Sequence, residues 1–219
     1  MKQLVKKIKI NTTLTLLTGL HIGGSKENVE IGGIDNPVIK INSKGYEGQP
    51  YIPGSSLKGK MRSLLEQCAG AAKVGEDSNV NALFGCIENK QKKIENQPSK
   101  LIVRDAYLTE ESVKMLRESR NLDMPYTENK FENTIDRVRG KAEHPRQTER
   151  VPAGAIFNVE FIINVWDDSN EQTLLGMLKK GISLIECDYL GGSGSRGYGQ
   201  VKFGELQIAE LTPENNWKV

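Results

Sequence analysis

The chain has few of the residues from which many metal and nucleic-acid sites are built. It has two histidines, His21 and His144, and three cysteines, none of which forms a C-x-x-C pair. This spacing argues against structural zinc and against a disulfide framework. Aromatic residues make up only 6% of the chain. No expected strand carries the aromatic pattern with which RRM-type sheets stack bases, so base stacking on a sheet is not predicted.

The chain also has little net charge and no long hydrophobic run. Its charge is +2, from 30 Lys+Arg against 28 Asp+Glu. A free-standing DNA-binding domain is usually much more basic, so any nucleic-acid contact must come from local clusters of cations. No apolar run approaches the ~20 residues of a membrane span, and the lysine-rich N-terminus shows no signal-peptide core. We therefore expect a cytoplasmic protein without a membrane partner.

Hydrophobic periodicity predicts an α+β fold. Alternating residues predict strands at 5–17, 101–108, 156–166 and 201–208, the last with a bulge at Gly204-Glu205. Helical spacing predicts helices at 55–68, 109–120 and 169–185, with Ser55 or Ser56, Thr109 and Ser169 as cap candidates. The order is that of a ferredoxin-like (RRM-like) βαββαβ core with an antiparallel sheet and both long helices on one face.

We expect one domain that spans residues 1–219. Its core comprises about 1–17, 51–110 and 153–211, and no internal repeat is evident. Residues 18–50 show neither the alternation of a strand nor the spacing of a helix, so we expect a long loop excursion there, after the first strand. Residues 121–152 are polar and form an insertion.

The most informative motif is a glycine-rich loop at 191–199, which holds five glycines in nine residues. Glycines permit positive φ and a close approach of backbone N–H groups to a ligand. Arg196 adds a planar fork suited to phosphate. The loop contains a G-x-G-x-x-G run but lies between a helix and a strand, the reverse of the dinucleotide-binding order. A polymeric phosphate backbone is a better candidate ligand for this loop than a dinucleotide. The alternative is that the loop is only a helix C-cap followed by a turn. The residues expected to contact RNA are Gly191, Gly192, Gly194, Arg196 and Gly197.

A second candidate is the start of the first helix. Ser55 and Ser56 precede three cations, Lys58, Lys60 and Arg62, within the first turns. A helix N-terminus with nearby cations binds phosphate well. The segment lacks the Gly-Lys-Ser/Thr of a P-loop, so nucleotide hydrolysis is not expected. The alternative is an ordinary amphipathic helix with a solvated face.

Two loop residues could take part in chemistry. His21 lies beside Gly23-Gly24, where it could approach a phosphate or a base, or simply bond the backbone of a turn. Asp35 follows Gly32-Gly33 and could ligate Mg²⁺ or orient or deprotonate a ribose 2′-OH. The alternative for Asp35 is an Asx turn before Pro37.

The segment 130–150 interleaves basic and acidic residues. Arg137 and Arg146 are its candidate RNA contacts. A solvated charged face is an equally good explanation of this pattern.

Several segments together resemble the RAMP superfamily, and more narrowly the repeating backbone subunit of type III-A CRISPR (Csm) effector complexes. The matching segments are His21–Gly24, Ile34–Val38, Ile52–Arg62, Phe131–Ile135, Pro145-Arg146, Glu149–Gly154 and Asp188–Gly197. The resemblance runs nearly end to end. The glycine loop alone would indicate only the superfamily.

The resemblance implies that further copies of this chain stack in a filament along a CRISPR RNA, together with other subunits of the Csm complex. The glycine loop, the helix-start cations and the His21 region would grip the guide backbone, and base pairing would choose the target RNA. The insertion, roughly 124–152, would be a thumb hairpin that displaces a base pair at regular intervals. Asp35 matches the family's catalytic residue for cutting complementary target RNA. Cleavage would need Mg²⁺ or another divalent cation, weakly held by Asp35 and shared with RNA phosphates, with Asp105 and Glu132 as possible helpers.

Two other functions stay open. The chain could be a non-catalytic, guide-binding structural subunit in which Asp35 only closes a turn. It could also be a stand-alone, guide-processing RAMP endoribonuclease with His21 in its site. The absence of a paired histidine and the thumb-like insertion disfavour the latter.

Overall fold

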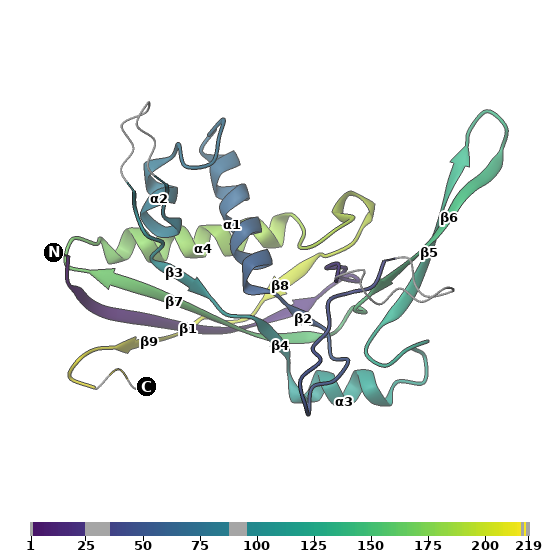
Figure 1. Cartoon of the computed structure of the whole chain (residues 1–219), viewed down its shortest axis with the longest axis horizontal. Helices are drawn as coiled ribbons and strands as arrows, with labels where there is room; N and C mark the ends of the chain where they lie inside the picture. The colour runs from purple at the N-terminus through teal and green to yellow at the C-terminus, as the bar shows by residue number, and fades with distance from the viewer. Residues whose placement is uncertain (1, 25–35, 88–95, 216, 218–219) are drawn as a thin grey trace.

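The computed structural model describes residues 2–24, 36–87, 96–215 and 217 (Figure 1). Within these residues, seven strands form one antiparallel sheet with the order β2-β4-β7-β1-β8, in which β3 also pairs with β7 and β9 with β1. The strands are β1 (Leu4–Leu16), β2 (Tyr51–Ile52), β3 (Leu101–Val103), β4 (Ala106–Leu108), β7 (Ile156–Trp166), β8 (Val201–Phe203) and β9 (Gln207–Leu211). The expected antiparallel sheet is confirmed.

Strands β1 and β7 form the centre of the sheet. Their register pairs Ile8 with Ile163, Ile10 with Phe161 and Leu14 with Phe157, and all six side chains are buried. Residues of one parity along a strand point to one face, so this alternation buries one face of the sheet under the helices. Both strands were predicted from their period of two. The expected irregularity in the last strand is present as the break between β8 and β9.

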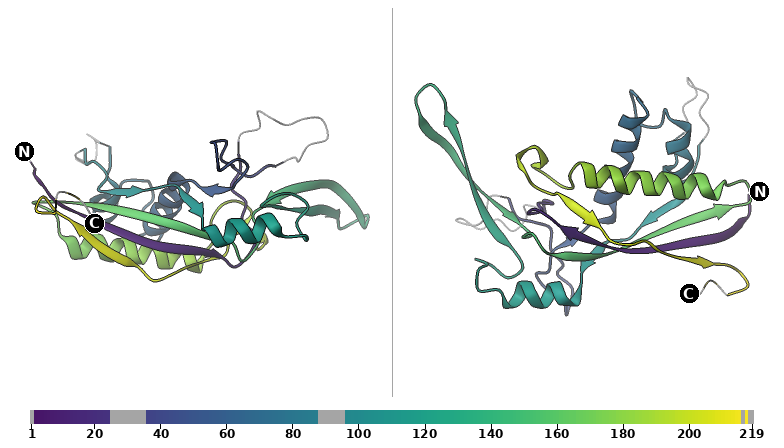
Figure 2. Two further views of the ribbon diagram at one scale, coloured as in Figure 1. Left: turned by 90° about the horizontal axis from the view of Figure 1, so that it is seen from below. Right: turned by 180° about the vertical axis from the view of Figure 1, so that it is seen from behind.

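Three helices pack together over that buried face (Figures 1 and 2). They are α1 (Gly54–Cys68), α2 (Ser78–Phe84) and α4 (Glu171–Cys187). The α1–α4 contact is close at Gly181, where an added Cβ would lie 2.3 Å from Met61 Cγ. The remaining helix, α3 (Glu110–Glu118), lies apart from these three. No helix of the described residues is long and apolar enough to cross a membrane.

The N-terminus of α1 differs from the prediction. The N-cap is Pro53, and neither Ser55 nor Ser56 caps the helix through its side chain. Instead, the Gly54 N–H donates to Asp105 Oδ1 at 2.8 Å, and a Cβ on Gly54 would lie 2.3 Å from the Val103 carbonyl oxygen. The helix therefore starts pressed against the β3–β4 connection, which supplies its cap. The single strand expected at 101–108 is split in two at this connection, where the register with β7 shifts by one residue.

Other helix ends follow the usual capping chemistry. Thr109 accepts from the Ser112 N–H and caps α3, as predicted. Asn170, not Ser169, caps α4. Helix α2 was not predicted; its N-cap is Asp77, which accepts from the Val80 N–H at 2.8 Å.

A separate two-stranded hairpin extends away from the body, at the end opposite the two termini (Figure 1). It consists of β5 (Glu128–Asp136) and β6 (Lys141–Arg150), joined by a turn in which Gly140 has φ +67°. Its apolar side chains are exposed: Phe131 by 70%, Ile135 by 63% and Val138 by 95%. The hairpin thus has no core of its own along its outer length and is anchored at its base.

Candidate nucleic-acid interface

Four segments that are distant in sequence meet at the base of the hairpin. Leu20 forms a bridge with Val151 just after β6, and the Ile39 N–H donates to the Ile22 carbonyl at 2.9 Å. The glycine-rich loop joins them, since the Gly192 N–H donates to the His21 carbonyl at 2.8 Å. The structure therefore brings His21 and the glycine loop together, as expected for residues with a shared function.

The glycine loop has the backbone that its composition predicts. Gly191, Gly197 and Gly199 all have positive φ, and a Cβ on Gly199 would lie 1.9 Å from the Leu190 carbonyl oxygen. Gly194 opens a short 3-10 turn, and a Cβ there would overlap the Tyr189 ring. Such positions favour glycine for steric reasons. At Gly197, by contrast, an added Cβ would meet open space.

The glycine loop is tied to the hairpin through Glu132 of β5. One oxygen of Glu132 accepts from the Tyr198 hydroxyl at 3.1 Å, and the other lies 3.1 Å from an Arg146 nitrogen and 3.6 Å from Arg196 Nε. Lys130 Nζ lies 3.4 Å from Glu132 Oε1 and also lies over the Tyr198 ring. We call this group (Glu132, Lys130, Arg146, Arg196 and Tyr198) the Glu132 junction. It contains two of the predicted RNA contacts, Arg146 and Arg196.

Charge and burial oppose each other at this junction. Burial alone would raise the pKa of the Glu132 carboxyl, but hydrogen bonds from Tyr198, Arg146 and Lys130 outweigh it and hold the pKa below its ordinary value. Burial, followed by the Glu132 charge, raises the pKa of Tyr198. Glu132 is therefore ionised at neutral pH and neutralises cations that face the glycine loop.

A second carboxylate, Glu149 of β6, holds residues 36–40. The Glu149 side chain is only 1% exposed. Its Oε2 accepts from the Val38 N–H at 2.8 Å, and its Oε1 accepts from the Thr127 hydroxyl at 2.6 Å and lies 2.5 Å from Lys40 Nζ. We call this group (Glu149, Thr127, Val38 and Lys40) the Glu149 junction. Asp35, the predicted catalytic and metal-binding residue, lies outside the described residues, immediately before Asn36.

His21 is bonded to the same strand. Its Nδ1 lies 2.7 Å from the Glu149 carbonyl oxygen. A carbonyl can only accept, so Nδ1 carries the hydrogen of this bond. The ring is thus bonded to a distant backbone carbonyl through Nδ1, and this bond does not use Nε2.

The three helix-start cations diverge from one another. Lys60 lies 2.7 Å from Asp188 and over the Tyr189 ring, just before the glycine loop. Lys58 donates to Ser99 Oγ and the Leu101 carbonyl, both at 2.7 Å, and its burial lowers its pKa. Of the three, Lys60 is the one that the structure places beside the glycine loop.

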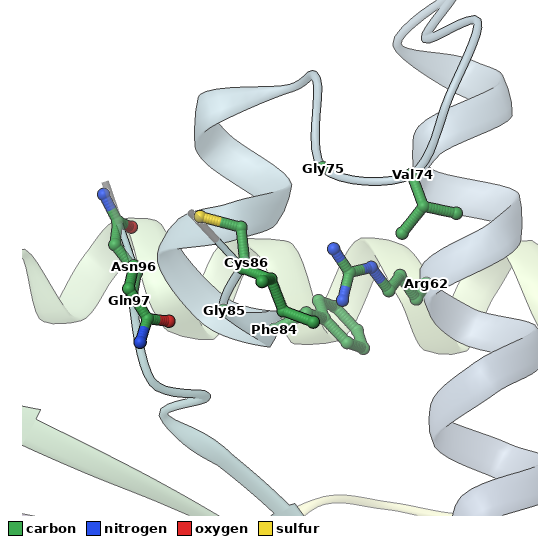
Figure 3. Close-up of a pocket in the computed structure, with 9 residues that line it drawn as sticks. Arg62, Val74, Gly75, Phe84, Gly85, Cys86, Asn96 and Gln97 are labelled. Carbon is green, nitrogen blue, oxygen red and sulfur yellow. The ribbon is translucent and has the colours of Figure 1, made fainter. Parts of the chain in front are cut away.

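Arg62 of α1 lies on the side of the helix near α2, away from Lys60. It pairs with Glu66 and borders a cavity of about 330 Å³ (Figure 3). The cavity is lined by Arg62, Val74, Gly75, Phe84, Gly85, Cys86, Ile87, Asn96 and Gln97. Arg62 is therefore not placed beside the glycine loop. Arg137 lies exposed in the hairpin turn, and Ser55 is exposed at the start of α1 with Ser56 half-buried beside it.

Sequence reasoning missed two sets of contacts. Glu132 was expected only as a possible helper of the metal at Asp35, and Glu149 was not singled out. The bonds that these two glutamates make depend on contacts between distant residues, although both lie inside the matching segments. The structure also places Tyr51 and Tyr107 as a cross-strand pair, with Tyr46 beside Tyr107 and ring centroids 6.0 and 6.4 Å apart. This aromatic cluster on the sheet has no counterpart in the sequence pattern because its members lie in different segments.

A preformed metal cage is not found in the part of the chain that the structure describes. No group of three or more His, Cys, Asp or Glu side chains lies close enough there to hold an ion. Asp35 is not among these described residues.

The similarity to known proteins covers nearly the whole chain. The sequence profile of the RAMP superfamily matches residues 13–202. The chain is 42% identical over 216 residues to the protein named "CRISPR system Cms endoribonuclease Csm3" of Methanocaldococcus jannaschii, covering 92% of this chain and 80% of that one. It is 44% identical over 212 residues to the protein of the same name from Streptococcus thermophilus, covering 94% and 90%.

Solved structures give a consistent result. A crystal structure of a Csm3-Csm4 subcomplex of the type III-A CRISPR-Cas interference complex matches with a TM-score of 0.60 and 29% identity, covering 98% of this chain and 84% of that one. A chain of the type III-B Cmr-beta complex bound to cognate target RNA has a TM-score of 0.61 at 18% identity, covering 93% and 61%, and shows a likeness of fold alone. From these matches, the chain belongs to the RAMP superfamily and, within it, to the Csm3 family.

Proposed function

We propose that this chain is a CRISPR RNA-binding backbone subunit of a type III-A interference complex and that it cleaves complementary target RNA at regular intervals. The observation that carries the proposal is the meeting of His21, the glycine loop and the segment that follows Asp35 at the base of the hairpin. The curated relatives carry the name of an endoribonuclease, which supports the enzymatic part.

The guide backbone would lie along the glycine loop. Backbone N–H groups of the loop, with Arg196, Lys60 and Arg146 beside it, suit a chain of phosphates and do not read bases. Sequence choice would then belong to base pairing between guide and target. Lys58, Arg62 and Arg137, which the structure places away from the loop, would contribute less to guide affinity.

The hairpin β5–β6 is the proposed thumb, on a core that we interpret as ferredoxin-like. The exposed apolar residues of the hairpin, Phe131, Ile135 and Val138, suit contact with unstacked bases better than contact with water. The proposed single domain divides into a core (about 1–17, 51–110 and 153–211), the loop excursion 18–50 and the thumb-like insertion 121–152.

Cleavage is assigned to Asp35, which would orient or deprotonate the target's own 2′-OH for attack on the adjacent phosphate. The bond from that phosphate to the 5′-oxygen of the next nucleotide would break, leaving a 2′,3′-cyclic phosphate and a 5′-hydroxyl. A bound Mg²⁺ or other divalent cation would stabilise the charge that develops on that phosphate. Asp35 would share this ion with RNA phosphates. His21, through its Nε2, would hold a phosphate or a base of the bound RNA near the cut.

The proposed partners are a CRISPR RNA, a complementary target RNA, further copies of this chain and other Csm subunits, in the cytoplasm. The matched crystal structure is a subcomplex of Csm3 with Csm4, which supports assembly with a second subunit type. A non-catalytic structural subunit remains the second candidate.

The proposal is tested by assembling the chain with its partner subunits on guides of defined sequence and adding end-labelled complementary RNA with Mg²⁺. We expect evenly spaced cuts whose positions shift with the guide when the complementary region is moved. Cuts that ignore the guide, or that occur only in precursor repeat RNA, would contradict the proposal.

A further inference from the structure

The segment 36–40 is held in a fixed register between two neighbours. On one side, Gly23 bridges Val38 in antiparallel fashion; on the other, Asn36 bridges Thr148 in parallel fashion. The Gly24 N–H donates to the Pro37 carbonyl at 3.0 Å, and the Glu149 N–H donates to the Asn36 carbonyl at 3.1 Å. These bonds join the His21 loop, the segment and the hairpin base into one unit.

The Glu149 side chain completes this unit from within. It is buried, and the three groups around it are all donors: the Val38 N–H, the Thr127 hydroxyl and the Lys40 ammonium. A buried carboxylate is tolerated only when it is paired and hydrogen-bonded in this way. Two of these donors, Val38 and Lys40, lie in the segment, and the third, Thr127, directly precedes the hairpin.

The same residue sets the histidine ring. Because the Glu149 carbonyl accepts from His21 Nδ1, the backbone of Glu149 fixes the orientation of that ring. One residue of the hairpin base thereby positions His21 through its backbone and residues 36–40 through its side chain. Asn36, at the start of this segment, is covalently joined to Asp35, and consecutive Cα atoms are only about 3.8 Å apart.

We propose that Glu149 is a positioning residue for target cleavage, acting through residues 36–40 and His21 without touching RNA. This inference rests on the proposed function. The Glu149 junction links β6 of the hairpin, proposed to engage RNA, to residues 36–40, which are covalently joined to the proposed catalytic residue. Misplacement of a reacting group by about 1 Å can reduce a rate by about a hundredfold.

The Glu149→Gln variant tests this inference with little change in shape. The glutamine amide has one accepting oxygen, whereas the Glu149 side chain faces three donors. The NH₂ group of the glutamine is itself a donor, so it cannot bond the Val38 N–H or the Lys40 ammonium. The matched control is Glu186→Gln. Glu186 also binds one backbone N–H, that of Phe203 at 2.7 Å, and one lysine, Lys202, but it lies on α4.

Three quantities are measured: amide hydrogen exchange of Val38 and Ile39 in the isolated chain, guide and target affinity of the assembled complex, and the cleavage rate at saturating target. In Glu149→Gln we expect faster exchange at Val38, unchanged affinities and a cleavage rate lower by about ten- to a hundredfold. Glu186→Gln is expected to match the wild type in all three. A purely structural role would instead lower affinity and cleavage together.

A second variant keeps the inference testable if Glu149→Gln does not assemble. Thr127→Val removes one donor at nearly constant volume and is expected to lower the cleavage rate by a smaller factor with affinity unchanged. Wild-type cleavage in Glu149→Gln, or in Thr127→Val when the first variant does not assemble, would overturn the inference. If the wild-type complex itself does not cut RNA, the proposed function fails, while exchange at Val38 still reports whether Glu149 holds the segment.

Discussion

Two carboxylates anchor the hairpin, and they do so in contrasting ways. Glu149 is 1% exposed and binds two neutral donors and one lysine, whereas Glu132 is 13% exposed and lies among Lys130, Arg146 and Arg196. Bonds to neutral donors in a buried place fix geometry and respond little to salt. Partly exposed charges can exchange one anion for another. The difference suggests that the Glu149 junction sets the cutting geometry, while the Glu132 junction presents cations that a guide phosphate can capture.

The largest effect is expected from a substitution in the glycine loop, which is tied to the Glu132 junction through Tyr198 and Arg196. In Gly199→Ala, the new Cβ would meet the Leu190 carbonyl oxygen at 1.9 Å with φ at +71°. Positive φ costs about 1–2 kcal/mol, and the required backbone shift adds about 1–3 kcal/mol. We expect loss of guide binding in a filter-retention assay and a lower midpoint of urea unfolding.

The control for this variant is Gly176→Ala. Gly176 lies exposed on α4, where an added Cβ meets no atom within 4 Å. Alanine should stabilise the helix by up to about 1 kcal/mol and leave guide binding intact. Equal loss of binding in both variants would contradict the role given to the loop backbone.

The next largest effect is on the free energy of unfolding, which the two junctions should stabilise to different extents. Glu149→Ala leaves the buried Val38 N–H and Thr127 hydroxyl without their acceptor, and we expect a loss of about 3 kcal/mol. Lys40, which is 30% exposed, can turn to solvent and keeps the loss at the low end. Glu132→Ala should cost only about 1.5 kcal/mol, mainly the bond from Tyr198. Urea unfolding of the isolated chain measures both, and the reverse order would refute the contrast.

The smallest effect is the pH dependence that Glu132 contributes. The pKa of this carboxyl is lowered in the folded chain from an ordinary value of 4.5. A lowered folded pKa stabilises the fold above the unfolded value, and this contribution is lost as the pH falls through the folded pKa. The Tm difference between wild type and Glu132→Gln should therefore be constant near neutral pH and shrink below pH 4.5. A difference that grows on acidification would show that the pKa is raised.

Sequence reasoning succeeded where periodicity is strong. Strands β1 and β7 and helices α1 and α4 bury one continuous face, so their apolar spacing is visible locally. The cap of α1 was mispredicted because Asp105 lies 51 residues from Gly54 in the chain. The hairpin has no apolar period because much of both strands is exposed, and only the family resemblance indicated it.

The site was predicted in its parts and not in its connections. His21 and the glycine loop were identified from residue type and spacing, and the structure places them in contact. Glu149 acts on Val38, which is 111 residues away, so no local pattern could reveal it. Arg62 and Lys60 were predicted together as helix-start cations, and the structure places only Lys60 beside the glycine loop. Helical spacing alone does not say which groups a long side chain will meet.

The most direct test of guided cleavage at this loop compares Asp35→Ala with Asn36→Ala in the complex assembled on a defined guide with Mg²⁺. Binding and cutting of end-labelled complementary RNA are measured together. We predict that Asp35→Ala binds target as the wild type does but makes none of the spaced cuts, whereas Asn36→Ala, whose backbone carbonyl makes the bond to Glu149, still cuts. Unchanged cutting by Asp35→Ala would contradict the assignment of catalysis to this loop and with it the division of labour between the two junctions.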